Sequence, residues 1–138
     1  MRIVRHCTER LPGGTRLWQK LACLADFNGT LLVYGYGTHG RPGREQLRAA
    51  LMDQVGGFDL GDYTRGENLI RIWVSSRCAL AFPKKITEHE TPLAAFVHEL
   101  GHHRQHVAGK QVPRTKKQNA SYEAVAERYG RMLLRSVT

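Results

Sequence analysis

The segment His98-Glu99-Leu100-Gly101-His102 constrains this 138-residue chain more than any other feature of its sequence. It reads H-E-x-x-H and lies in the stretch 91–107, where apolar residues recur at helical spacing. Thr91 is a suitable N-cap and Pro92 suits the first helical position, so we expect a helix over this stretch. Two histidines four residues apart then project from one face of the helix, one turn apart.

This spacing suits a zinc ion. Two imidazoles one turn apart can bind the same ion, and the glutamate after the first histidine stays free to accept a proton from water beside the metal. We therefore interpret His98 and His102 as metal ligands and Glu99 as a catalytic base. The alternative is an amphipathic helix whose solvent-exposed face is rich in histidine.

A catalytic zinc site has three protein ligands, so a third must come from elsewhere in the chain. His106 continues the histidine stripe, but it lies about 12 Å along the helix axis from His98. That is too far for a shared ion, so we expect His106 beside the site or on the surface. Glu123 and Glu127 lie one turn apart on a last predicted helix, which runs from about 119 or 121 to 135 and can pack beside the motif helix. The alternative for either glutamate is a solvated position near an arginine.

The two segments together resemble a known family. HELGHHRQH followed by EAVAERYGRMLL is similar to the ImmA/IrrE-type metallopeptidases, which carry H-E-L-G-H, a further histidine four residues on, and then E-x-x-A-N-x-F-A-x-x-L-L. The positions that fall on the second pattern, with conservative changes at Tyr129 and Gly130, are Glu123, Ala126, Tyr129, Gly130, Leu133 and Leu134. Glu127 stands where the family usually has asparagine, and the proline-containing end after the leucines is missing. The resemblance spans roughly residues 91–134.

The resemblance implies a small zincin-like α+β domain, in which a C-terminal helix supplies a glutamate ligand to the H-E-x-x-H helix beside a short mixed sheet. It favours Glu123 over Glu127 as the third ligand. It also implies zinc-dependent hydrolysis of a peptide bond, often in an intracellular regulatory protein such as a repressor. The oxyanion formed in such a reaction usually needs a donor besides zinc. The spacing does not choose among Tyr122, Tyr129, His103 and His39.

The composition is that of a soluble cytoplasmic protein. Lys and Arg exceed Asp and Glu, 21 to 12, which gives a net charge of +9 and favours acidic partners. The three cysteines, Cys7, Cys23 and Cys78, are widely spaced and suit reduced thiols. The sequence shows neither a signal peptide nor a membrane span, so we expect a cytoplasmic protein. We expect its substrate to be a protein or peptide. Binding of nucleic acid is allowed but not required. The alternatives are a catalytically inactive zincin-like binding protein and a basic nucleic-acid-associated module.

The remainder of the sequence predicts compatible elements of one α+β domain over residues 1–138. We expect strands at 1–4, 30–36 and 68–75, and helices at 15–27 and 44–55. The strand 68–75 alternates, which predicts one buried and one exposed face. Either an edge of this strand is free and binds extended peptide by strand addition, or both edges are covered.

Overall fold

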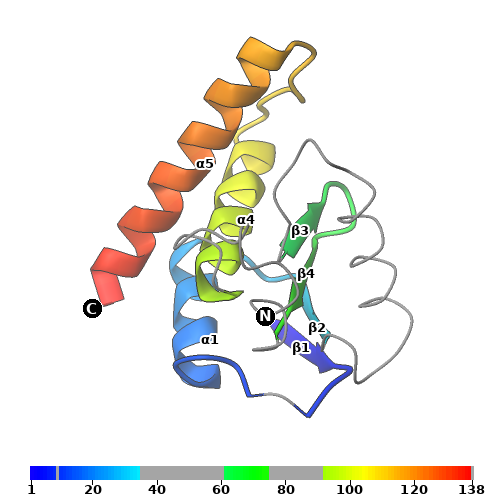
Figure 1. Ribbon diagram of the computed structural model, residues 1–138, viewed down its shortest axis with the longest axis vertical. Coiled ribbons are helices and arrows are strands. Elements are labelled where there is room, and N and C mark those ends of the chain that lie inside the picture. The colour runs from blue at the N-terminus through cyan, green and yellow to red at the C-terminus, as the bar shows by residue number, and fades with distance from the viewer. Residues whose placement is uncertain (9, 35–60, 75–91, 138) are drawn as a thin grey trace, which may run out of the picture.

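A computed structural model of the chain describes residues 1–8, 10–34, 61–74 and 92–137. Within these ranges the fold is α+β, with one four-stranded mixed sheet and three helices. In chain order the elements are β1 (Arg2–Arg5), α1 (Thr15–Leu24), β2 (Thr30–Tyr34), β3 (Gly61–Thr64), β4 (Leu69–Trp73), α4 (Pro92–Val107) and α5 (Lys116–Val137) (Figure 1). The predicted helix 44–55 and the predicted N-cap Thr91 lie outside the described residues. None of the helices in these ranges combines the length and the apolar character that a membrane span requires.

The sheet has the strand order β1-β2-β4-β3. The pairs β1–β2 and β2–β4 are parallel, whereas β3 and β4 form an antiparallel pair. β4 therefore lies between two strands, and of the two alternatives for the segment 68–75, the covered one is correct. A peptide cannot add to an edge of β4, because both edges already pair with a strand.

One hydrophobic core joins the sheet to the helices. Alternate residues of β2 and β4 point to this core, as the period of a strand requires. α1 and α4 contribute apolar side chains from the helix faces that lie against the sheet. The largest fully buried side chains of the core are Trp18, Leu21, Phe27, Leu31, Val33, Ile70, Ile72, Phe96 and Leu100. The Trp18 and Phe96 rings stack with centroids 4.5 Å apart, which links α1 to α4.

α4 is the central helix of the fold. It contacts β3 and β4 on one side and α5 on the other (Figure 1). α4 and α5 approach closely because glycines face backbone at two positions. A Cβ added at Gly101 would lie 2.6 Å from the Ala126 carbonyl oxygen, and one added at Gly130 would lie 3.0 Å from the Val97 carbonyl oxygen. Gly101, inside the motif helix, thus permits close approach of α5, at a cost of up to about 1 kcal/mol in helix propensity relative to alanine.

The helix ends differ from the sequence prediction for local reasons. α1 ends at Leu24 rather than at 27, because Asp26 adopts a positive φ of 55° and the Phe27 amide donates to the Ala22 carbonyl. α5 begins at Lys116 rather than at 119 or 121. Thr115 caps it, since its hydroxyl accepts a hydrogen bond from the Gln118 amide at 3.1 Å.

Two predictions for the sheet were wrong. β3 was missed, because Gly61 and Asp62 are weak strand formers and the strand depends on its pairing with β4. The second face of β4 is not solvent-exposed along its length, because Trp73 is 1% exposed. It stacks on Tyr34, its partner on β2, with ring centroids 5.4 Å apart.

Candidate metal centre

Three side chains from two helices converge beside the crossing of α4 and α5. His98 and His102 project from α4, and Glu123 comes from α5. Their ligand atoms all lie within 4.8 Å of one another, close enough for one metal ion. Glu123 Oε2 lies 2.7 Å from His98 Nε2 and 3.1 Å from His102 Nε2. The sequence predicted these three residues together, and the packing of α5 on α4 brings them together.

The donor set fits a divalent metal. Zinc bonds to nitrogen and oxygen of about 2.0–2.1 Å in a tetrahedron place neighbouring donor atoms roughly 3.3 Å apart. The two distances from Glu123 Oε2 fall slightly below that value, so a small outward movement of the carboxylate would admit the ion. The Glu123 side chain is 45% exposed, whereas His98 and His102 are 21% and 12% exposed. The carboxylate is therefore the ligand with most freedom to move.

The second ring nitrogen of each histidine also has a partner. His98 Nδ1 lies 3.1 Å from Glu127 Oε2, and His102 Nδ1 lies 2.9 Å from Gln105 Oε1. Gln105 is itself oriented, because its Nε2 donates to the Tyr122 carbonyl at 2.8 Å. An Nδ1–H that donates to an acceptor fixes the tautomer that leaves Nε2 free for a metal, which is the usual arrangement of metal-ligating histidines.

The two glutamates of α5 thus occupy different positions. Glu123 faces the Nε2 atoms of both histidines, whereas Glu127 faces only the outer nitrogen of His98. Glu127 also pairs with Arg131, at 3.3 Å and one turn further along α5. Glu123 therefore completes the His-His-Glu group, whereas Glu127 contacts only the outer nitrogen of one of its histidines.

Glu99 is the buried acid of the site. It is 8% exposed, and it follows His98 directly. Burial raises the pKa of Glu99 to about 7, although the nearby His102 and His98 oppose the rise. A carboxylate with a pKa near neutrality exchanges protons readily at physiological pH, as a general base must.

Without a metal, the ligands form ion pairs among themselves. Burial lowers the pKa of His98, but hydrogen bonds to Glu123 and Glu127 and the charge of Glu99 outweigh it and raise the pKa to about 9. Hydrogen bonds from His102 and His98 lower the pKa of Glu123 to about 2. The pocket that would hold a cation therefore holds protons in its absence.

Two of the predicted donors, His103 and Tyr129, make contacts with other elements. His103 is buried and joins α4 to β3 and to the end of α1, because Tyr63 donates to its Nδ1 at 3.1 Å and its Nε2 lies 3.4 Å from the Asp26 carbonyl. Tyr129 packs against the core, and its ring lies beneath the Arg104 guanidinium at 5.0 Å. His39 lies outside the described residues.

His106 and Tyr122 complete the surroundings. His106 is not in the group of close ligand atoms, and its ring lies 6.2 Å from that of Tyr63. Tyr122 stacks on His102 with centroids 5.0 Å apart and an angle of 21° between the ring planes. Sequence reasoning missed Gln105, although its position three residues after His102 places the two side chains on one helix face.

Comparison with protein-family models, with curated proteins and with solved structures finds no match to this chain. The assignment of the site therefore depends on its own geometry. The described residues hold a His-His-Glu group that is close enough to bind a metal ion, beside a buried glutamate.

Proposed function

We propose that this protein is a zinc-dependent metalloendopeptidase. The observation that carries the proposal is the placement of Glu123 against the Nε2 atoms of both histidines of H-E-x-x-H. His, His and Glu form a hydrolytic zinc set. The resemblance of residues 91–134 to the ImmA/IrrE-type metallopeptidases supports the same conclusion. On this proposal the substrate is a protein or peptide.

The chemistry is divided among a few side chains. Zinc, when bound, acidifies a water molecule and polarises the carbonyl that it attacks. Glu99 would accept a proton from the attacking water and pass it to the leaving amine, the role of a general base and then of a general acid. Glu127 and Gln105 hold the two imidazoles in the tautomer and orientation that the metal needs.

The test is a comparison of the parent protein with Glu99→Gln, both loaded with zinc. We expect about one zinc per chain in both proteins, because Glu99 is not among the ligands. Only the parent should cleave a mixture of peptides from a proteome digest, with new termini identified by mass spectrometry. We expect the substitution to lower the rate by at least about 100-fold, the usual range for a general base.

Two results would overturn the proposal. A parent protein that binds no zinc after incubation with the metal and removal of excess would exclude a zinc enzyme. Zinc binding without any cleavage that depends on Glu99 would instead favour a zincin-like binding protein. The substrate mixture should contain intact folded proteins as well as short peptides. A peptidase of this size can require an unfolded segment in its substrate, and the two kinds of substrate separate that requirement from a lack of activity.

A further inference from the structure

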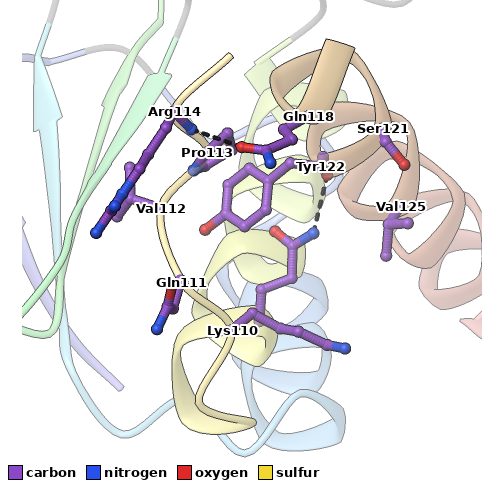
Figure 2. A pocket seen from close by; sticks show the side chains of 10 residues that line it. Lys110, Gln111, Val112, Pro113, Arg114, Gln118, Ser121, Tyr122 and Val125 are labelled. Carbon is purple, nitrogen blue, oxygen red and sulfur yellow. Dashed lines mark hydrogen bonds between the residues drawn. The ribbon is translucent and has the colours of Figure 1, made fainter. Parts of the chain in front are cut away.

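A cavity of about 630 Å³ is lined in part by two residues that contact His102. It is bounded by the end of α4, the loop 110–114 and the first turns of α5 (Figure 2). The cavity and the metal centre share part of a wall. Gln105 lines the cavity and holds His102 Nδ1, and Tyr122 lines the cavity and stacks on the His102 ring. The cavity thus adjoins His102, one of the three residues of the His-His-Glu group.

The loop that forms the outer wall is held in place at both ends. The Lys110 amide donates to the Gln105 carbonyl at 3.0 Å, and the Lys110 carbonyl accepts a hydrogen bond from the Arg65 guanidinium of the β3–β4 turn. At the other end, the Arg114 amide donates to Gln118 Oε1 at 3.0 Å (Figure 2). These bonds tie the loop to α4, to the sheet and to α5. A wall fixed in this way costs little ordering free energy when a ligand binds.

The charge of the cavity has one sign. Lys110 and Arg114 line it, and none of its described lining residues is acidic. Their side chains lie on opposite sides of Tyr122 in Figure 2. The Arg65 guanidinium adds a third positive charge behind this wall, where it donates a hydrogen bond to the Lys110 carbonyl. Arg65 Nη1 is buried and makes no hydrogen bond with the described residues.

The remaining lining suits a short side chain with an apolar stem. Val112, Pro113 and Val125 give apolar surface, and Gln111 and Ser121 add neutral polar groups. A glutamate or aspartate side chain matches this combination, since its methylene groups can contact the valines while its carboxylate accepts hydrogen bonds from cations. A lysine or arginine side chain would meet like charges.

We propose that this cavity is a specificity subsite that binds an acidic side chain of the peptide, close to the bond that is cleaved. The proposal rests on the proposed peptidase function. It names the substrate class as peptides with Asp or Glu at one fixed position near the scissile bond. A phosphate of a nucleic acid is the competing occupant, and the experiment below separates the two.

The experiment begins with cleavage sites in a proteome digest treated with the zinc-loaded protein. We expect Asp and Glu to be enriched at a single position near the cut. Two synthetic peptides, with Glu or Gln at that position, are then compared. We expect the Glu peptide to be cleaved with a kcat/KM about tenfold higher, and added salt to reduce the difference, because the pairs are solvent-accessible.

The variant K110E/R114E tests the cavity itself. We expect it to lose or reverse the preference for the Glu peptide over the Gln peptide, chiefly through KM. The control K116E/K117E makes the same change in net charge on adjacent exposed residues that do not line the cavity. It should keep the preference, which separates the cavity from the overall charge of the chain.

A measurement of peptide binding tests the subsite without requiring cleavage. The zinc-loaded Glu99→Gln protein is titrated with both peptides and with a single-stranded oligonucleotide. Tighter binding of the Glu peptide, lost in K110E/R114E, supports the subsite even if the parent cleaves nothing, and then only the peptidase proposal fails. Equal binding and cleavage of the two peptides overturns the subsite. Oligonucleotide binding that K110E/R114E abolishes, without peptide preference, assigns the cavity to phosphate instead.

Discussion

At the scale of single residues, two glutamates one turn apart on α5 occupy different positions at the candidate site. Glu123 reaches the inner nitrogens of both histidines, and Glu127 reaches only the outer nitrogen of His98. A ligand contributes a bond to the metal, whereas an orienting group contributes the correct tautomer of the ligand. The two tasks predict different losses of metal affinity.

We expect Glu123→Ala to weaken zinc binding by well over about 100-fold, because a three-ligand site becomes a two-ligand site. Glu127→Ala should weaken it by roughly 10-fold to 100-fold, the usual effect of removing a partner of a ligating histidine. Competition with a chelator of known affinity measures both. His106→Ala is the control and should leave zinc affinity unchanged. A larger loss in Glu127→Ala than in Glu123→Ala would reverse the assignment of the two carboxylates.

The protons held by the metal-free site predict how its stability depends on pH. The pKa values of Glu99 (about 7) and His98 (about 9) exceed their ordinary values of 4.5 and 6.5. Each raised pKa contributes to the free energy of unfolding. The contribution is fully present below the ordinary pKa of the group, and it is lost as pH rises through about 7 for Glu99 and about 9 for His98. The pKa of Glu123 is lowered to about 2, so its contribution is present above pH 4.5 and is lost as pH falls towards 2.

We therefore expect the metal-free protein to be most stable near pH 5, with Tm falling by roughly 5–10 °C between pH 5 and 9. Zinc replaces these protons, so the zinc-loaded protein should show a smaller fall or a rise over the same range. Thermal unfolding followed by circular dichroism, with chelator or with zinc, measures both curves. A metal-free Tm that rises steadily from pH 5 to 9 would contradict the ion pairs of the site.

At the scale of elements, the site depends on how closely two helices cross. Ala126 of α5 faces Gly101 of α4, and Glu123 lies one turn before Ala126 on the same helix. A side chain at position 101 must push the α5 backbone away, and Glu123 moves with that backbone. The crossing therefore couples the packing of the helices to the position of a ligand.

We expect Gly101→Ala to destabilise the protein by about 1–2 kcal/mol. Overpacking at the helix crossing costs about 1–3 kcal/mol, which outweighs the gain in helix propensity of up to about 1 kcal/mol from alanine. Zinc affinity should fall as well. Urea unfolding and zinc competition measure the two effects. Ala124→Ser, which adds one atom on the exposed face of α5, is the control. A more stable protein with unchanged zinc affinity would show that the crossing tolerates a methyl group.

The elements that could be predicted from the sequence are those with a local pattern of apolar residues or a motif. The strands β1, β2 and β4 and the helices α1 and α4 follow from apolar periodicity, and the His-His-Glu group follows from the motif and the resemblance. The shorter features depend on context. β3 forms by pairing with β4, and Gln105 and Tyr122 gain their contacts with His102 only after α5 packs on α4. Such contacts have no local sequence pattern from which to predict them.

At the scale of the whole molecule, the hydrophobic core and the His-His-Glu group involve different parts of α5. The core is built between the sheet, α1, α4 and the C-terminal half of α5, which contributes Leu133, whereas the His-His-Glu group joins α4 to the N-terminal half of α5. The buried residues of α5 are Ala126, Gly130 and Leu133, and none of its residues before Ala126 is buried. The first half of α5 is held by the Thr115 cap, the Gln105 contact with Tyr122 and, on our proposal, the metal.

Removal of zinc should therefore loosen the first half of α5 and leave the sheet intact. We expect amide hydrogen exchange over residues 116–125 to rise by about 10-fold to 100-fold on chelation, because the local opening loses the metal's contribution, while β2 and β4 stay protected. Mass spectrometry of peptic fragments resolves the two regions. Glu123→Ala in the presence of zinc is the matched variant and should exchange like the chelated parent. A uniform rise in amide hydrogen exchange over α5 and the sheet would contradict this prediction. It would show that the ion stabilises the fold as one cooperative unit and that the core alone does not keep the sheet protected.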